Sequence, residues 1–167
     1  MAVKMKIAML AGAAIAVAAA APAHATDDLQ LTRLATCQDS WFEWKSNDPG
    51  RLKQYVTRIQ TEFTPGQAGA YTPKSSLTVL GFTVTHVYPE SVGMGVGFSV
   101  FANATFDRVK AIAEKTLGRQ VSKCEPPSDN MRICELALGE KKTFFLLTED
   151  SPKSTKTLFG CGYFYEK

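Results

Sequence analysis

One stretch of the chain decides the fold: residues 80–102, which read LGFTVTHVYPESVGMGVGFSVFA. Bulky side chains alternate with mostly small or polar ones on both sides of a short turn at residues 89–93. Alternation with a period of two indicates a strand with one buried face, and two such runs joined by a turn predict an antiparallel hairpin. His86 ends the apolar face that begins at Leu80, so we expect a partly buried strand residue and not a catalytic base.

Helical patterns precede this hairpin. Asp27 and Asp28 can cap a first helix over about residues 28–45, in which apolar residues recur at a spacing of three and four. Asp48 and Pro49 then suit the cap and first position of a second helix over residues 49–63. We expect these two helices to form a helical hairpin. Residues 64–76, with two prolines and two glycines, are expected to be a mobile loop.

One helix and further strands follow the hairpin. A third helix is expected to begin near Thr105 and to stop at Gly118. Strand patterns cover about residues 119–124, 131–138, 142–149 and 156–165. The order α-α-β-β-α-β-β-β-β predicts an α+β fold, in which helices cover one face of an antiparallel sheet of about five to six strands.

The first 25 residues have the layout of an export signal. Lys4 and Lys6 precede an apolar, alanine-rich run over residues 7–21, and residues 23–25 read AHA. The run is shorter than the roughly 20 residues that span a bilayer. We therefore expect a signal peptide over residues 1–25, one domain over residues 26–167 and no stable membrane anchor. The leader favours the bacterial periplasm, and full secretion is the alternative.

Composition excludes several classes of protein. Removal of the leader leaves 17 of the 19 basic residues against 16 acidic ones, so the exported chain is close to neutral. A nucleic-acid binder usually has a large basic excess, so we expect no nucleic-acid partner. An apolar content of 45% is too high for a disordered chain.

The exported part contains four cysteines, at positions 37, 124, 134 and 161. An even number in an oxidising compartment predicts disulfides. The spacing of Cys124 and Cys134 suits two strands of one hairpin, which leaves Cys37 and Cys161 to tie the first helix to the last strand. A zinc site is the alternative, but it favours closely spaced C-x2-C pairs, and the sequence has none.

Motifs for catalysis are missing from the sequence. It contains no G-x-S-x-G, S-x-x-K or H-E-x-x-H pattern. Glycines 93, 95 and 97 stand at the start of a predicted strand, whereas a phosphate loop needs them where a strand turns into a helix. We therefore expect no enzyme, no cofactor and no metal site. The alternatives are an envelope hydrolase that uses scattered carboxylates or His86, and a small-ligand carrier.

Two surfaces are candidates for binding. Residues 125–132 form a loop whose base a Cys124–Cys134 bridge would close and whose two prolines stiffen it. The last strand carries two tyrosines, a residue type that is frequent in interfaces, although this face equally suits packing under the first helix. The candidate binding residues are Glu125, Asp129, Asn130, Met131, Arg132, Tyr163 and Tyr165.

In size, export signal and disulfide content the chain is similar to periplasmic lysozyme inhibitors and to immunity proteins against secreted toxins. This analogy assigns no residues. It leads us to expect a periplasmic protein-binding module of the inhibitor or immunity type. Its partner would be another protein, either a secreted toxin or an envelope-acting enzyme. The sequence does not define an oligomeric state.

Overall fold

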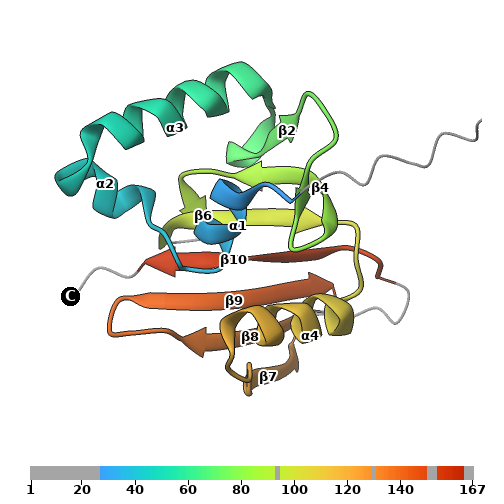
Figure 1. The fold of residues 1–167 in the computed structure, drawn as a ribbon. Coiled ribbons are helices and arrows are strands. Elements are labelled where there is room, and N and C mark those ends of the chain that lie inside the picture. Colours follow the sequence, from blue (N-terminus) through green and yellow to red (C-terminus); the bar gives the residue numbers. More distant parts are fainter. Residues whose placement is uncertain (1–26, 93–94, 129–130, 150–153, 164–167) are drawn as a thin grey trace, which may run out of the picture.

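The computed structural model describes residues 27–92, 95–128, 131–149 and 154–163 (Figure 1). The predicted signal peptide and three candidate binding residues, Asp129, Asn130 and Tyr165, lie outside the described residues. No helix within these ranges is long and apolar enough to cross a membrane.

The sheet is antiparallel at every strand pair and has more strands than predicted. Eight strands of the described chain lie side by side in the order β1 (Phe63–Pro65), β2 (Tyr71–Pro73), β4 (Phe82–Tyr88), β6 (Gly95–Ala102), β10 (Thr157–Tyr163), β9 (Lys142–Glu149), β8 (Met131–Ala137) and β7 (Lys123–Ser128). Two short strands, β3 (Thr78–Val79) and β5 (Ser91–Val92), pair with β4 and β6. The predicted hairpin of residues 80–102 is confirmed as the β4–β6 pair.

The predicted α+β class is confirmed. Within the described ranges there are four α-helices, α1 (Leu29–Ala35), α2 (Trp41–Asn47), α3 (Pro49–Glu62) and α4 (Phe106–Leu117), and one short 3-10 helix, η1 (Gln67–Gly69). Helices α1 and α4 lie against one face of the sheet (Figure 1). Helix α3 contributes to the same side through Tyr55, whose ring centroid is 6.4 Å from that of Phe98 on β6. We call this covered side the inner face.

The first predicted helix is wrong as a single element, because the structure divides residues 28–45 into α1 and α2. Cys37 has a φ of 59°, a left-handed conformation that stops α1. Ser40 then begins α2, since its side chain accepts a hydrogen bond from the Glu43 N–H. Asp28 caps α1 and Asp48 caps α3, as the sequence predicted.

The prediction of a mobile loop over residues 64–76 is also wrong. Strands β1 and β2 form a tight hairpin there, closed by a 2.7 Å hydrogen bond from the Gly66 N–H to the Ala70 carbonyl. Ala68 and Gly69 both have positive φ, at 53° and 76°. Two left-handed residues in succession match the twist of a two-residue hairpin turn, which explains why the chain reverses here.

Strand β4 contains a bulge that changes which residues face the core. Val84 lies opposite Ala102, whereas His86 lies opposite Phe101, so Thr85 is an extra residue on β4. Val87 is therefore fully buried and His86 is exposed. The expectation that His86 ends the buried face is wrong, because the bulge reverses the alternation after Val84.

The core lies between the inner face and the helices. Its fully buried side chains include Phe98, Phe144 and Phe159 of the sheet and Leu31 and Leu34 of α1. Both predicted disulfides are confirmed: Cys37–Cys161 ties the end of α1 to β10, and Cys124–Cys134 joins β7 to β8. Two disulfides indicate an oxidising compartment and an exported protein. The strand predicted at residues 119–124 begins only at Lys123.

Candidate functional site

The face of the sheet opposite α1 and α4, the outer face, carries a row of apolar side chains. Strand register places one residue of this row directly beside the next across β8, β9, β10, β6 and β4. The members are Ile133, Leu147, Leu158, Phe101 and His86, and we call them the outer row. The first four are half-buried and His86 is exposed. Because their neighbours along each strand pack into the core, these side chains point away from it.

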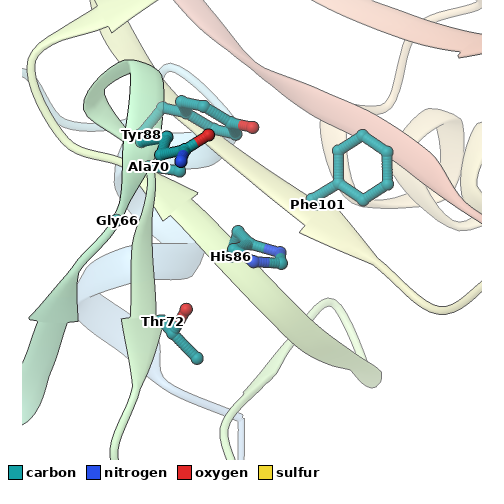
Figure 2. Close-up of a pocket in the computed structure, with 7 residues that line it drawn as sticks. Gly66, Ala70, Thr72, His86, Tyr88 and Phe101 are labelled. Carbon is teal, nitrogen blue, oxygen red and sulfur yellow. The ribbon is translucent and has the colours of Figure 1, made fainter.

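A pocket lies at the His86 end of the outer row, where the β1–β2 hairpin meets β4 and β6 (Figure 2). Its volume is about 310 Å³, and it is lined by Gly66, Gln67, Ala70, Thr72, His86, Tyr88 and Phe101. Tyr71 pairs with Val87, a register that sets the next residue, Thr72, beside His86. The hairpin that the sequence analysis missed therefore forms one wall of the pocket, and the strand bulge supplies its histidine.

Thr85, the bulge residue, fixes the orientation of the His86 imidazole. The Thr85 hydroxyl donates a 3.1 Å hydrogen bond to the Phe101 carbonyl, and it lies 3.2 Å from Nδ1 of His86. Since this hydroxyl uses its proton on the carbonyl, it accepts from the imidazole, and Nδ1 carries a proton. Nε2 then has a free lone pair and no hydrogen-bond partner among the described residues.

The chemistry that this lining offers is ring contact and hydrogen bonding. Three rings and the polar side chains of Gln67 and Thr72 surround the space. None of the seven lining residues is a lysine, an arginine, a carboxylate or a cysteine. A metal ion would need several carboxylate, histidine or thiolate ligands, and no such cluster occurs among the described residues.

The disulfide-closed hairpin holds its predicted binding residues in different environments. Glu125 is exposed, and Met131 has 37% of its surface exposed. Arg132 turns to the inner side, where its guanidinium lies 4.4 Å from the centre of the Phe106 ring and 3.3 Å from Asp107 Oδ1. Arg132 therefore packs on the start of α4, a contact that spacing along the sequence did not reveal.

Tyr163 belongs to the covered side of the sheet. Only 6% of its surface is exposed, and its hydroxyl donates a 2.7 Å hydrogen bond to the Asp39 carbonyl. Burial, together with the nearby charges of Glu43 and Asp39, raises the pKa of Tyr163 to about 12. This placement corresponds to packing under the first helix, the other role that the sequence allowed for this face.

Two charged clusters hold the helices together. The buried carboxylate of Asp39 accepts hydrogen bonds from Arg51, from the Ser40 N–H and, at 3.0 Å, from Trp44 Nε1. Arg33 adds an ion pair to the same carboxylate at 3.5 Å. The opposite charges lie in direct contact, and the cluster connects the segment between α1 and α2 to α3. We interpret it as a structural element.

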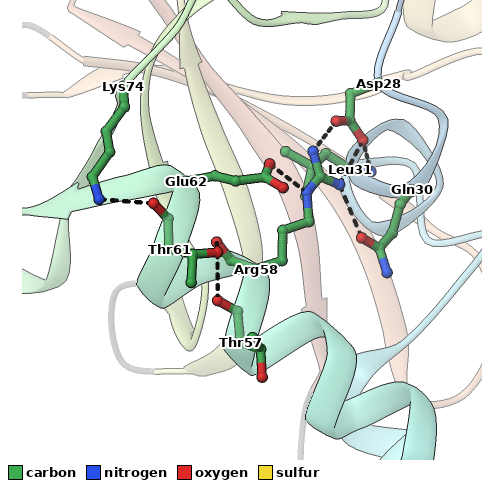
Figure 3. A network of polar contacts seen from close by, with 8 residues as sticks. All are labelled: Asp28, Gln30, Leu31, Thr57, Arg58, Thr61, Glu62 and Lys74. Carbon is green, nitrogen blue, oxygen red and sulfur yellow. Dashed lines mark hydrogen bonds and ion pairs between the residues drawn. The ribbon is translucent and has the colours of Figure 1, made fainter.

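The second cluster centres on Arg58 of α3, which lies between Asp28 and Glu62 (Figure 3). Burial alone would raise the pKa of Asp28, but hydrogen bonds from Arg58 and the Leu31 N–H outweigh it, and the pKa of Asp28 is lowered. Arg58 also donates to Gln30 Oε1 at 2.9 Å. A shallow groove of about 390 Å³ runs along this part of α3, but both of its charged residues at this end, Arg58 and Glu62, are already paired.

Comparisons with known proteins found no match for this chain. No family model matches it, and neither a curated protein nor a solved structure matches it.

Proposed function

We propose that this chain is an exported protein-binding module of the inhibitor or immunity type, and that it binds its partner with the outer face of the sheet. The partner would be a secreted toxin or an envelope-acting enzyme. The observation that carries the proposal is the outer row, in which half-buried apolar side chains continue without a break from β8 to β6 and reach the pocket at His86.

The dimensions of this face suit a protein partner. Five strands at a spacing of about 4.8 Å extend over about 19 Å. A standard interface covers about 800 Å² on each partner. The outer row would therefore extend across most of the width of an interface of standard size. Half-buried apolar residues that continue across strands are more typical of an interaction site than single exposed ones.

The scaffold is rigid enough to present such a surface. The outer row stands on strands that hydrogen-bond to both neighbours, and the bridges fix β10 to the α1 end and β7 to β8. A surface that is already ordered loses little entropy on binding. The near-neutral charge of the exported chain favours contacts based on shape over long-range steering.

Capture of a partner with matched variants tests this proposal. The purified protein would be immobilised and exposed to an envelope extract from the cells that produce it. Leu158→Glu places a charge at the centre of the outer row. Ile112→Glu is the control, because Ile112 is an exposed apolar residue of α4 with 37% of its surface accessible. Thermal unfolding would confirm that both variants fold.

We expect a protein that the wild type and Ile112→Glu retain and that Leu158→Glu loses, followed by a titration with the purified partner. Met131→Ala and Arg132→Ala test the disulfide-closed hairpin in the same assay. Loss of binding in these variants alone would move the interface to residues 125–132. Equal retention by every variant would contradict a role for either surface.

A small-ligand carrier is the second candidate, and the pocket beside His86 favours it. Its volume of about 310 Å³ lies at the lower end of the range for ligand sites. Native mass spectrometry of the protein purified from its own envelope would test this function. A stoichiometric small molecule that Thr72→Trp displaces would support the carrier and argue against the protein-binding module.

A further inference from the structure

We propose that the pocket beside His86 receives one aromatic side chain of the partner protein, a tyrosine or a tryptophan, whose O–H or N–H donates a hydrogen bond to His86 Nε2. This inference rests on the proposed protein-binding function and adds the chemistry of the contact.

The lining favours an uncharged occupant over a charged one. Its side chains are aromatic, aliphatic, amide or hydroxyl in character, and no lysine, arginine or carboxylate is among them. A charged group placed there would meet no oppositely charged side chain among the lining residues, so it would gain no ion pair. Rings from His86, Tyr88 and Phe101 offer edges and faces to another ring, and such contacts favour an aromatic group over an aliphatic one.

The state of the imidazole selects for a donor. Thr85 accepts from Nδ1, so the neutral ring offers an acceptor at Nε2 and no second donor. A tyrosine hydroxyl or an indole N–H satisfies that acceptor, whereas phenylalanine leaves it unpaired. The pocket should therefore distinguish tyrosine and tryptophan from phenylalanine, although all three carry a ring.

Size and position favour a single side chain over a free ligand. A volume of about 310 Å³ is small for a ligand that has to bind without other contacts. Phe101 lines the pocket and also belongs to the outer row, so a ring bound in the pocket sits at the end of the flat apolar surface. Interfaces commonly have this arrangement, in which one aromatic residue enters a pocket and weaker contacts around it exclude water.

The test uses blocked amino acids as probes, followed by NMR of the isotopically labelled protein. The probes are N-acetyl-tyrosinamide, N-acetyl-tryptophanamide, N-acetyl-phenylalaninamide and N-acetyl-leucinamide. We expect saturable shifts at His86, Phe101 and Thr72 with the tyrosine and tryptophan probes. The phenylalanine probe should bind about fivefold more weakly, the effect of one hydrogen bond, and the leucine probe should cause no saturable shift.

Two variants locate the binding. Thr72→Trp fills the pocket from an exposed strand position, and Thr83→Trp adds the same side chain at an exposed position of β4 that does not line it. The shifts should disappear in the first variant and persist in the second. Absence of saturable shifts in the wild type, an equal response to the leucine probe, or an unchanged response in Thr72→Trp would each overturn the proposal.

Failure of this inference is separable from failure of the proposed function. The probe titration needs no partner, so it reports on the pocket alone. If Leu158→Glu abolishes partner capture while Thr72→Trp leaves it intact, the outer face binds the partner and the pocket proposal is wrong. If the probes bind as expected and no protein is captured on the outer face, the aromatic site is real and the protein-binding function is wrong.

Discussion

Removal of the two disulfides one at a time should destabilise the protein to clearly different extents. The perturbation is a pair of double variants, Cys37→Ala with Cys161→Ala, and Cys124→Ala with Cys134→Ala. The first bridge joins residues 124 positions apart and the second joins residues 10 positions apart. The two variants therefore make the same chemical change but release loops of very different length.

The expected magnitudes follow from the entropy of loop closure in the unfolded chain. A bridge that closes about 125 residues contributes roughly 4.9 kcal/mol at 25 °C, and one that closes about 11 residues contributes roughly 2.8 kcal/mol. Burial should widen this difference in stability between the two variants. Cys37 and Cys161 are both buried in the core, whereas Cys124 of the short bridge is exposed. A domain of this size is stable by about 5–15 kcal/mol in total, so loss of the long-range bridge should remove about a third of that stability or more.

Urea unfolding, followed by the fluorescence of Trp41 and Trp44, measures both free energies of unfolding. The variant without Cys37–Cys161 should be less stable than the variant without Cys124–Cys134 by at least about 2 kcal/mol. Its m-value should rise, because the unfolded chain becomes less compact. An equal loss in the two variants, or a larger loss from removal of the short bridge, would refute the loop-entropy argument for this protein.

Three further predictions concern single positions. Ala68→Gly should raise the free energy of unfolding by about 0.5–1 kcal/mol, because Ala68 has a φ of 53°, whereas Ala70→Gly, at a φ of −77°, should lower it; chemical denaturation compares the two. Gly160→Ala should cost about 3 kcal/mol, since the new Cβ would lie 2.5 Å from Ser99 Cβ, and an unchanged melting temperature would contradict the packing. Asp28→Asn should be less stable than wild type at neutral pH, and the difference in free energy of unfolding should close as the pH falls below 3.8. The pKa of Asp28 is lowered in the folded state, so the charged carboxylate stabilises the protein above the unfolded-state pKa, and this stabilisation is lost on protonation. A difference in free energy that stays constant down to pH 2 would exclude this linkage.

The sequence predicted the elements whose causes are local. Asp48 and Pro49 define the start of α3, and Gly118, with a φ of 64°, ends α4 at the predicted residue. A cap or a left-handed stop acts within one turn of the chain, so the residues that cause it are neighbours in the sequence. The same reasoning missed Ser40 as a cap, because the apolar spacing of α1 continues into α2 and hides the break at Cys37.

The spatial order of the strands could not be predicted in the same way. Strand β10 follows β9 in the chain, as expected for a hairpin, but its other edge pairs with β6. That pairing joins residues more than 50 positions apart, and alternation along one strand carries no information about its partner. Only the cysteines gave a long-range signal, and it correctly paired Cys37 of the N-terminal helical segment with Cys161 of the last strand.

The candidate site was hidden for a more specific reason: it depends on two breaks in regular geometry. Alternation from Leu80 assigned His86 to the end of the buried face, and the extra residue at Thr85 reverses that assignment. Ala68 stands at the first of the two left-handed positions of its turn, where asparagine or glycine is usual, so the sequence predicted a loop and not a hairpin. The strand bulge and the hairpin turn lie on two sides of the same pocket. Thr85 also contacts the His86 imidazole through its hydroxyl. A bulge that served only to shift the strand register would not need a side chain that orients the next residue. The Thr85 residue does both, and this is the strongest structural reason to test His86 first.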